Sequence, residues 1–203
     1  MRKVFFSSIY KIWKKKPKEL SQWLMLLRLK FQAIEQGGRI EFGNGLKIEQ
    51  EIIFQGRGLL QLKDEVMLGY ELGGSPSAPI LLQPREIDSV ISIGRKSILV
   101  NGTEIIARNS ITIGENCRIG ARCIIIDSDF HGLKPQERNT GGKVSPVTIG
   151  NNVWLGLGVI ILKGVTIGDD AVIGAGSIVT RDIPEGGIAV GNPVRIIGSV
   201  YDS

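Results

Sequence analysis

The segment Ile149–Pro184 divides without remainder into six units of six residues: IGNNVW, LGLGVI, ILKGVT, IGDDAV, IGAGSI and VTRDIP. Every unit begins with Ile, Leu or Val. Four of the six have Gly second, and the fifth position reads Val, Val, Val, Ala, Ser and Ile. A period of six matches neither the 3.6-residue turn of an α-helix nor the two-residue alternation of an amphipathic strand. A fixed period of this kind indicates a solenoid, in which each coil buries its apolar face against the next.

Each six-residue unit is expected to form one short strand and one corner. The first residue would point inward and stack on its counterparts in neighbouring coils, and the small fifth residue would fill the narrow interior beside the corner. Glycine tolerates the backbone geometry of a sharp corner. Three units would close one triangular coil, with parallel strands about 4.8 Å apart. The sequence therefore predicts an all-β solenoid, a parallel β-helix.

The same register begins earlier, in IGENCR (113–118) and IGARCI (119–124). The two cysteines of the chain, Cys117 and Cys123, occupy the fifth position of these units. Two cysteines do not make a disulfide framework, and the fifth position suits a small buried residue. We therefore expect both cysteines to fill the core rather than to act in redox chemistry or metal binding.

The N-terminal part of the chain follows a different pattern. Residues 18–36, KELSQWLMLLRLKFQAIEQ, have apolar residues at helical spacing, with Pro17 at the start and Gly37 after the end. Such a helix packs on the main domain or on a neighbouring subunit, or it rests with the lysines at 14–16 on an anionic membrane surface. The predicted apolar stripe consists of Leu20, Trp23, Leu24, Leu27, Phe31 and Ile34, widened by Leu26 and Leu29.

These patterns divide the chain into a basic, amphipathic helical segment over 1–37, a β-helix domain over 38–198 and a tail over 199–203. Between 38 and 90 the six-residue period is faint, but short β-type runs recur between Gly and Asn turns. Residues 73–88, GGSPSAPILLQPREID, contain three prolines and predict a loop or an irregular coil.

Composition sets further bounds. The net charge is +5, and no apolar run reaches the roughly 18 residues that a membrane-spanning helix needs. The start, MRKVFFSSIYKIWKKK, lacks the long apolar region and the small-residue cleavage site of a secretory signal. The charge fits anionic small molecules or a membrane surface better than nucleic acid. These features predict a cytoplasmic protein that does not bind nucleic acid.

His131 is the only histidine of the chain and stands in DSDFHG (127–132), where the run of repeats stops. A neutral imidazole accepts a proton near pH 7, as a general base must. Its other ring nitrogen would be held by Asp127, by Asp129 or by a backbone carbonyl. The polar excursion near 127–146 would project from the solenoid, either as a disordered loop or as an arm that closes an active site. We predict that His131 is catalytic.

These motifs resemble the hexapeptide-repeat acyltransferases, whose fold is a left-handed parallel β-helix. More specifically, the chain looks like the sugar and cell-surface polysaccharide O-acetyltransferases of the galactoside and maltose acetyltransferase type. The segments that carry the resemblance are IGENCRIGARCIIIDSDFHG, LKPQERNTGGKVSP, the repeats from VTIGNN to RDIP, and GNPVRIIG. The resemblance implies transfer of an acetyl group from acetyl-CoA to a sugar hydroxyl, without a metal, in polysaccharide biosynthesis. It also implies a homotrimer with active sites between subunits.

The resemblance implies roles for individual residues of the acceptor site. The histidine that follows such repeats is the catalytic base, which here is His131. An asparagine thirty residues before it, here Asn101, contributes to the acceptor site. Where the galactoside type often has paired acids shortly after that asparagine, this chain has Arg108 and Asn109. Trp154 would be a packing residue or a platform beside the acceptor or the pantetheine arm.

A binding path for CoA needs a low wall for pantetheine and cations for its phosphates. Small residues of the last coils would keep the wall low: Gly156, Gly158, Gly174, Ala175 and Gly176. Cations near the end of the solenoid would meet the phosphates: Lys163, Arg181 and Arg195. The resemblance implies the following contacts with CoA: Leu157, Ala175, Thr180, Arg181 and Arg195.

Two other functions remain open at this stage. An amine acceptor, on an amino sugar or a xenobiotic, would also need a base, so His131 does not distinguish N-acetylation from O-acetylation. A non-catalytic β-helix scaffold is the second alternative, although a zinc site of the carbonic-anhydrase kind needs several histidines. The basic and apolar N-terminal segment favours a lipid-linked or surface-polysaccharide precursor as acceptor and a position at the inner face of the membrane.

Overall fold

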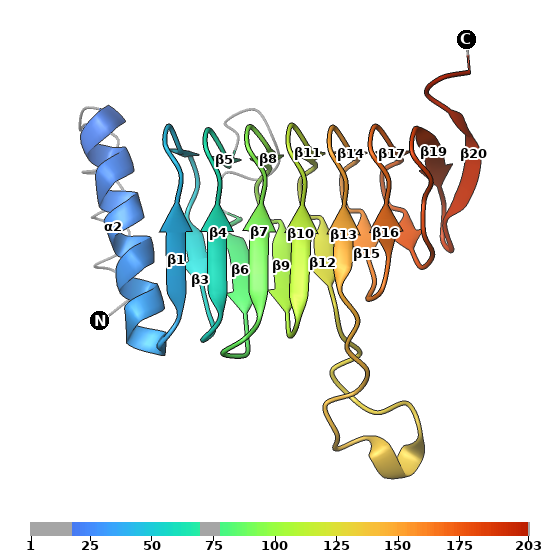
Figure 1. The fold of residues 1–203 in the computed structure, drawn as a ribbon, viewed down its shortest axis with the longest axis horizontal. Helices are drawn as coiled ribbons and strands as arrows, with labels where there is room; N and C mark the ends of the chain where they lie inside the picture. The colour runs from blue at the N-terminus through green and yellow to red at the C-terminus, as the bar shows by residue number, and fades with distance from the viewer. Residues whose placement is uncertain (1–17, 70–77, 203) are drawn as a thin grey trace.

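The computed structural model describes residues 18–69 and 78–202. After one helix, α2 (Lys18–Gln36), the chain winds through short strands that form three sheets, the faces of a triangular prism (Figure 1). The first sheet contains β1 (Arg39–Phe42), β4 (Leu59–Leu62), β7 (Val90–Ile93), β10 (Ser110–Ile113), β13 (Val147–Ile149) and β16 (Thr166–Ile167).

The other two sheets are built in the same way. The second sheet contains β2 (Lys47–Ile48), β5 (Met67–Leu68), β8 (Ile98–Leu99), β11 (Arg118–Ile119), β14 (Trp154–Leu155), β17 (Val172–Ile173), β19 (Gly187–Val190) and β20 (Arg195–Ser199). The third contains β3 (Ile52–Phe54), β6 (Ile80–Pro84), β9 (Glu104–Ala107), β12 (Ile124–Ile126), β15 (Ile160–Ile161) and β18 (Ile178–Val179). Among the strands of the described residues, all pairs are parallel except β19 with β20. We call the line of corners between the second and third sheets edge 2–3, and that between the third and first sheets edge 3–1.

The six-residue repeat has the predicted geometry. Ile149 pairs with Ile167, Trp154 with Val172 and Ile160 with Ile178, so that one coil takes eighteen residues, or three units. The first and fifth residues of all six units point inward and are almost fully buried. The first residues are Ile149, Leu155, Ile161, Ile167, Ile173 and Val179, and the fifth are Val153, Val159, Val165, Ala171, Ser177 and Ile183. The prediction of a parallel β-helix is confirmed.

The cysteines behave as the repeat predicts. Cys117 and Cys123 are free thiols without exposed surface, stacked in the core beneath Val153 and Val159 of the next coil. Burial raises the pKa of both thiols, and that of Cys123 to about 11. Both thiols are therefore protonated and shielded near neutral pH.

The described strands before residue 90 stack in the same three sheets as the later ones, although their coils differ in length. β1, β4 and β7 pair in parallel and in register, although the six-residue period there is faint. The prediction of a loop or irregular coil over 73–88 is wrong for Ile80–Pro84, which is strand β6. Ile80 and Leu82 face the core, and the proline stands at the end of the strand, where the chain turns a corner. Residues 70–77 lie outside the described part of the chain.

Helix α2 closes the N-terminal end of the solenoid (Figure 1). Three glutamines form hydrogen bonds with the backbone of the first coil, as a preceding strand would. The side chain of Gln22 both donates to and accepts from Ile48, at 2.8 and 2.7 Å. Gln32 accepts from the amide of Phe54, while Gln36 donates to the carbonyl of Phe54 and accepts from the amide of Gly56. The helix thus protects the open edge of the sheets.

The packed face of α2 differs from the predicted stripe. Leu29 and Ala33 are buried against the first coil, with Met25 and Leu26 packed around them. The stripe faces solvent, because the glutamines that form hydrogen bonds with the backbone of the first coil lie on the opposite side of the helix. Its exposed members are Leu20, Trp23, Leu27, Phe31 and Ile34. The helix therefore packs on the main domain, one of the alternatives above, but it does so through Leu26, Leu29 and their neighbours rather than through the exposed members of the stripe.

The excursion between β12 and β13 is an arm that leaves edge 3–1 (Figure 1). The two ends of the arm meet at its base, where the amide of Asp129 donates to the carbonyl of Lys143 at 3.0 Å. Ser128 and Val144 form an antiparallel bridge beside them. A short 3₁₀ turn, Pro135–Glu137, stands at the tip. The arm is therefore an ordered hairpin-like element with a narrow neck.

Candidate active site

The predicted site residues lie on two different edges of the prism. Edge 3–1 carries the residues around the arm, and edge 2–3 carries Asn101 and the small residues. On edge 3–1 lie Asp127, Asp129, His131, Lys163, Thr180 and Arg181, and on edge 2–3 lie Asn101, Gly156, Leu157, Gly158, Gly174, Ala175 and Gly176. Within one chain, the third sheet separates His131 from Asn101.

The ring of His131 is exposed and held by a backbone carbonyl. Its Nδ1 lies 2.9 Å from the carbonyl oxygen of Arg138, across the arm. Because a carbonyl can only accept a hydrogen bond, Nδ1 carries a proton, and in the neutral ring Nε2 then keeps its lone pair. Of the three possible partners, the structure selects the carbonyl rather than Asp127 or Asp129. The ring is thus in the tautomer that a general base requires.

The backbone around His131 is held in unusual geometry. Phe130 has φ +61°, in the left-handed region that bulky residues rarely occupy. Gly142, with φ +67°, packs so closely that a Cβ on it would lie 2.6 Å from the carbonyl oxygen of His131. Only glycine fits there without displacing the histidine.

The two aspartates support the neck of the arm. Asp127 is fully buried and accepts hydrogen bonds from the amides of Arg108 and Asn109, at 2.8 and 2.7 Å. Burial raises the pKa of Asp127, while these hydrogen bonds oppose the rise. Asp129 forms an ion pair with Lys163 at 2.7 Å. Lys163, a predicted phosphate contact, is therefore committed to the neck in this structure.

Edge 2–3 has a low and closely packed wall. A Cβ on Gly156 would lie 2.6 Å from the amide nitrogen of Ala175 in the next coil, so the glycine lets the coils approach. Gly158 and Gly176 take φ near +70° at the corners and face open space. Leu157 projects from this wall and is 58% exposed. Such a surface offers exposed backbone to an extended ligand.

The remaining predicted residues lie elsewhere. Asn101 is 4% exposed. Trp154 is 56% exposed on the outer face of the second sheet, beside an open hollow of about 590 Å³ that Tyr201 also lines. Arg195 lies in β20 and Arg181 follows β18, both exposed near the C-terminal end of the solenoid. No single surface of one chain brings all of these residues to His131.

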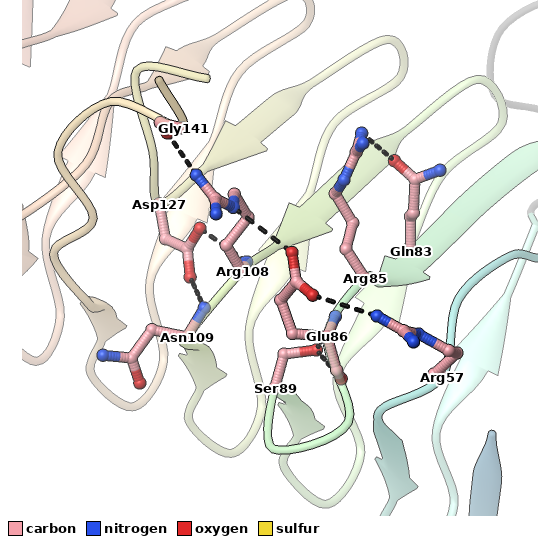
Figure 2. Close-up of polar contacts among 9 residues, drawn as sticks. All are labelled: Arg57, Gln83, Arg85, Glu86, Ser89, Arg108, Asn109, Asp127 and Gly141. Atoms are coloured by element: carbon pink, nitrogen blue, oxygen red, sulfur yellow. Dashed lines mark hydrogen bonds and ion pairs between the residues drawn. The ribbon is translucent and has the colours of Figure 1, made fainter. Parts of the chain in front are cut away.

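A polar cluster on edge 3–1 was not predicted as part of the site (Figure 2). Arg108 donates to the carbonyl of Gly141 in the arm and forms an ion pair with Glu86 at 3.5 Å. The guanidinium of Arg85 lies 5.4 Å from the centre of the Phe130 ring. The sequence has arginine at 108, but its spacing does not indicate that the arm folds back onto this residue.

Comparison with known proteins assigns the chain to a family. The model for the hexapeptide repeat of succinyl-transferase matches residues 110–128 and 146–181. A putative acetyltransferase of Schizosaccharomyces pombe is 34% identical over 142 residues, which are 68% of each chain. The chain belongs to the hexapeptide-repeat acetyltransferases. The left-handed β-helix of this family is the fold described above.

Other similar proteins match shorter parts of the chain. Galactoside O-acetyltransferase of Escherichia coli is 44% identical over 115 residues, 56% of each chain. Nodulation protein L of Rhizobium meliloti is 45% identical over 53% of this chain and 59% of its own. The aligned region thus spans about half to three fifths of the length of these relatives.

Solved structures of acetyltransferases share the architecture. The polySia specific acetyltransferase NeuO superposes with a TM-score of 0.60 at 29% identity, over 77% of this chain and 67% of its own. A galactoside acetyltransferase in complex with coenzyme A gives a TM-score of 0.53 at 31% identity, over 77% and 65%. In this hexapeptide-repeat acetyltransferase, no helix within 18–69 and 78–202 has the length and hydropathy to span a membrane.

Proposed function

We propose that the protein is an acetyl-CoA-dependent O-acetyltransferase that acts on a sugar hydroxyl in cell-surface polysaccharide biosynthesis. The observation that carries this proposal is His131, whose Nδ1 is fixed by the carbonyl of Arg138 so that Nε2 is free to accept a proton. Galactoside O-acetyltransferases and a CoA complex among the similar proteins support the donor and the acceptor class. No metal is required, because the thioester is already activated.

The reaction needs one base and one oxyanion donor. Nε2 of His131 accepts the proton of the acceptor hydroxyl as its oxygen attacks the thioester carbonyl. A backbone N–H of a coil donates to the oxyanion that forms. When the C–S bond breaks, the imidazolium returns the proton to the departing sulfur. The products are an acetyl ester of the sugar and CoA with a free thiol.

We propose a homotrimer, because the two halves of the site lie on separate edges. Three-fold closure sets edge 3–1 of one subunit against edge 2–3 of the next. His131 then faces the low wall around Leu157 and Ala175 of its neighbour, with Asn101 further along the same edge. The arm adds the second wall of the cleft. Pantetheine would run along this wall, with Thr180, Arg181 and Arg195 at the phosphate end of CoA.

We propose that the enzyme works in the cytoplasm, at the inner face of the membrane. The outward face of α2 exposes Trp23 and Phe31, which are 58% and 60% exposed, within the apolar stripe. Residues 1–36 hold nine Lys and Arg against two acidic residues, in a chain whose totals are 25 and 20. An apolar stripe beside concentrated positive charge fits an anionic lipid surface. In the proposed trimer, the three helices would lie at one end of the prism.

Sedimentation with vesicles tests the membrane contact. The wild-type protein should bind vesicles that contain phosphatidylglycerol and should bind neutral vesicles less, with binding weakened by salt. The double variant Trp23→Ser, Phe31→Ser should lose binding but keep activity on a soluble sugar. Equal binding of vesicles by this variant would contradict the proposal. A trimer mass that doubles with concentration in the wild-type protein but not in the variant would also contradict it, because the stripe would then join two trimers.

The acetyl transfer itself is tested by release of free thiol from acetyl-CoA in the presence of a panel of glycosides, nucleotide sugars and polysaccharide repeats. An acetylated product identified by mass spectrometry, absent with His131→Ala, is expected. If the protein binds CoA but none of the sugars in the panel causes release of thiol, the assignment of a sugar acceptor is contradicted.

A further inference from the structure

Arginines occupy edge 3–1 at three successive corners before the arm (Figure 2). Arg57 follows β3, Arg85 opens the turn after β6, and Arg108 follows β9. Their backbones are stacked, since the amide of Arg57 donates to the carbonyl of Arg85 and that of Arg85 to the carbonyl of Ala107. The sequence spacing of these residues is irregular, but the coils align them in one row.

The row carries a surplus of positive charge. Glu86 is shared by two guanidiniums, those of Arg57 at 3.3 Å and Arg108 at 3.5 Å. Arg85 makes no ion pair in the described part of the chain, and its polar contact is Gln83, at 3.5 Å. Asp88 of the same turn is exposed and likewise makes no described ion pair.

The nearby buried carboxylate does not cancel this charge. Asp127 is turned inward, and its two oxygens accept the backbone amides of Arg108 and Asn109 rather than a guanidinium. Exposed ion pairs such as those of Glu86 contribute little free energy, so a better anion can replace them.

Two of these guanidiniums touch the segments on either side of His131. Arg85 lies over the ring of Phe130, the residue before the histidine. Arg108 donates to the carbonyl of Gly141, and the next residue, Gly142, packs against the backbone of His131. A ligand held by this row would therefore lie at the neck of the arm, beside the catalytic ring.

The arm divides edge 3–1 into two parts of different composition. The coils after it carry Thr180 and Arg181, which belong to the proposed CoA path. The coils before it carry the arginine row, which that path does not use. The acceptor then approaches from the side of the earlier coils, and the charge it meets there is positive.

We propose that Arg85, assisted by Arg57, binds an anionic group on the sugar acceptor, a carboxylate or a phosphate, and that Arg108 positions the arm. This inference rests on the proposed function and adds the charge of the substrate. A guanidinium offers a planar pair of donors that matches the two oxygens of a carboxylate or phosphate. The stacked Phe130 ring keeps the Arg85 fork in place.

The test compares three acceptors that differ in charge: methyl galactoside, galacturonic acid and galactose 1-phosphate. Thiol release should show a lower KM for an anionic sugar than for the neutral one, and the favoured anion tells a carboxylate from a phosphate. Arg85→Gln should raise the KM for that anion by about 10- to 100-fold, the usual cost of a lost charged hydrogen bond. Its kcat and its KM for acetyl-CoA should be unchanged.

A matched control is Arg95→Gln. Arg95 is an exposed arginine at another corner, paired with Glu115 at 3.1 Å, and its loss should leave all three KM values unchanged. Equal KM values for neutral and anionic sugars, or an Arg85→Gln effect that is the same for both, would overturn the inference while the acetyl transfer stands.

Calorimetric titration of the anionic sugars into the CoA-bound protein separates the two proposals. Binding that Arg85→Gln abolishes supports the anion site even if no acetyl transfer is found, in which case only the proposed function fails. Absence of binding to the wild-type protein overturns the anion site.

Discussion

The coils before the arm and the coils after it form the same prism from different sequences. After the arm, paired residues such as Ile149 and Ile167 are eighteen positions apart, and small residues line edge 2–3. Before it, paired residues such as Arg39 and Leu59 are twenty positions apart or more. The inward positions are apolar and buried in both parts. The inward positions therefore specify the fold, and the corners are free to differ.

The largest expected effect lies at the junction of the two parts. His131→Ala should lower turnover by about 100- to 10,000-fold, the range for loss of acid–base assistance. The affinity for acetyl-CoA should change little, because the proton to be removed belongs to the acceptor. Steady-state kinetics and a CoA titration measure both. Near-full turnover by the variant would show that another group acts as the base.

Residues of the coils after the arm should affect the binding of acetyl-CoA and not that of the acceptor. Replacing both Arg181 and Arg195 by Ala should weaken the binding of acetyl-CoA by about 10- to 100-fold, as for lost charge-assisted hydrogen bonds to phosphate. Both side chains are exposed, so the melting temperature should stay the same. If calorimetry shows an unchanged affinity for CoA, the two arginines are solvated surface charges that do not contact CoA.

Asn101→Ala should reduce acceptor turnover less than the loss of His131 does, because a positioning residue takes no part in proton transfer. The KM for acetyl-CoA should remain at the wild-type value. A loss of turnover as large as that of His131→Ala, in a variant with normal stability, would contradict the positioning role.

The neck of the arm should contribute to stability. Asp127→Ala should lower the free energy of unfolding by about 1–3 kcal/mol, because the amides of Arg108 and Asn109 lose their acceptor. Burial raises the pKa of Asp127, so the wild-type protein loses part of this advantage as pH rises through that pKa. Chemical denaturation should thus show a smaller difference between the two proteins at pH 7 than at pH 4. A difference that grows with pH would contradict this account.

The smallest effect is expected for the cysteines. The fifth position holds Val in three of the six repeats, so Cys117→Val should change the free energy of unfolding by less than about 1.5 kcal/mol. Because burial raises the pKa of Cys123 to about 11, a thiol reagent at pH 8 should react only after unfolding. Rapid reaction of the native protein would show that these coils open.

The sequence predicts the parts of the molecule that depend on inward positions. The register of Ile149 and its counterparts follows from the period alone, and the missed strand β6 was hidden by Pro84, which the end of a strand tolerates. The helix was predicted, but its packed face was not, because Gln22 and Gln36 bind backbone groups that no periodicity identifies.

The candidate site was predictable only in part. His131 could be found because it is the single histidine and stands where the repeats stop. Its partner, the carbonyl of Arg138, and the contact of Arg85 with Phe130 depend on how the arm folds back. Contacts made by backbone atoms or across an irregular loop have no signature in residue spacing.

Activity of mixed trimers tests the central claim, a site shared between edge 3–1 of one subunit and edge 2–3 of the next. His131→Ala removes the base from one edge, and Ala175→Trp fills the exposed wall of the other without entering the core. Each variant alone should be nearly inactive. Trimers that contain both, isolated by two different tags after co-expression, should regain a substantial fraction of wild-type thiol release, because some interfaces join two intact edges. Activity no higher than that of the two parent variants would show that each site lies within one subunit.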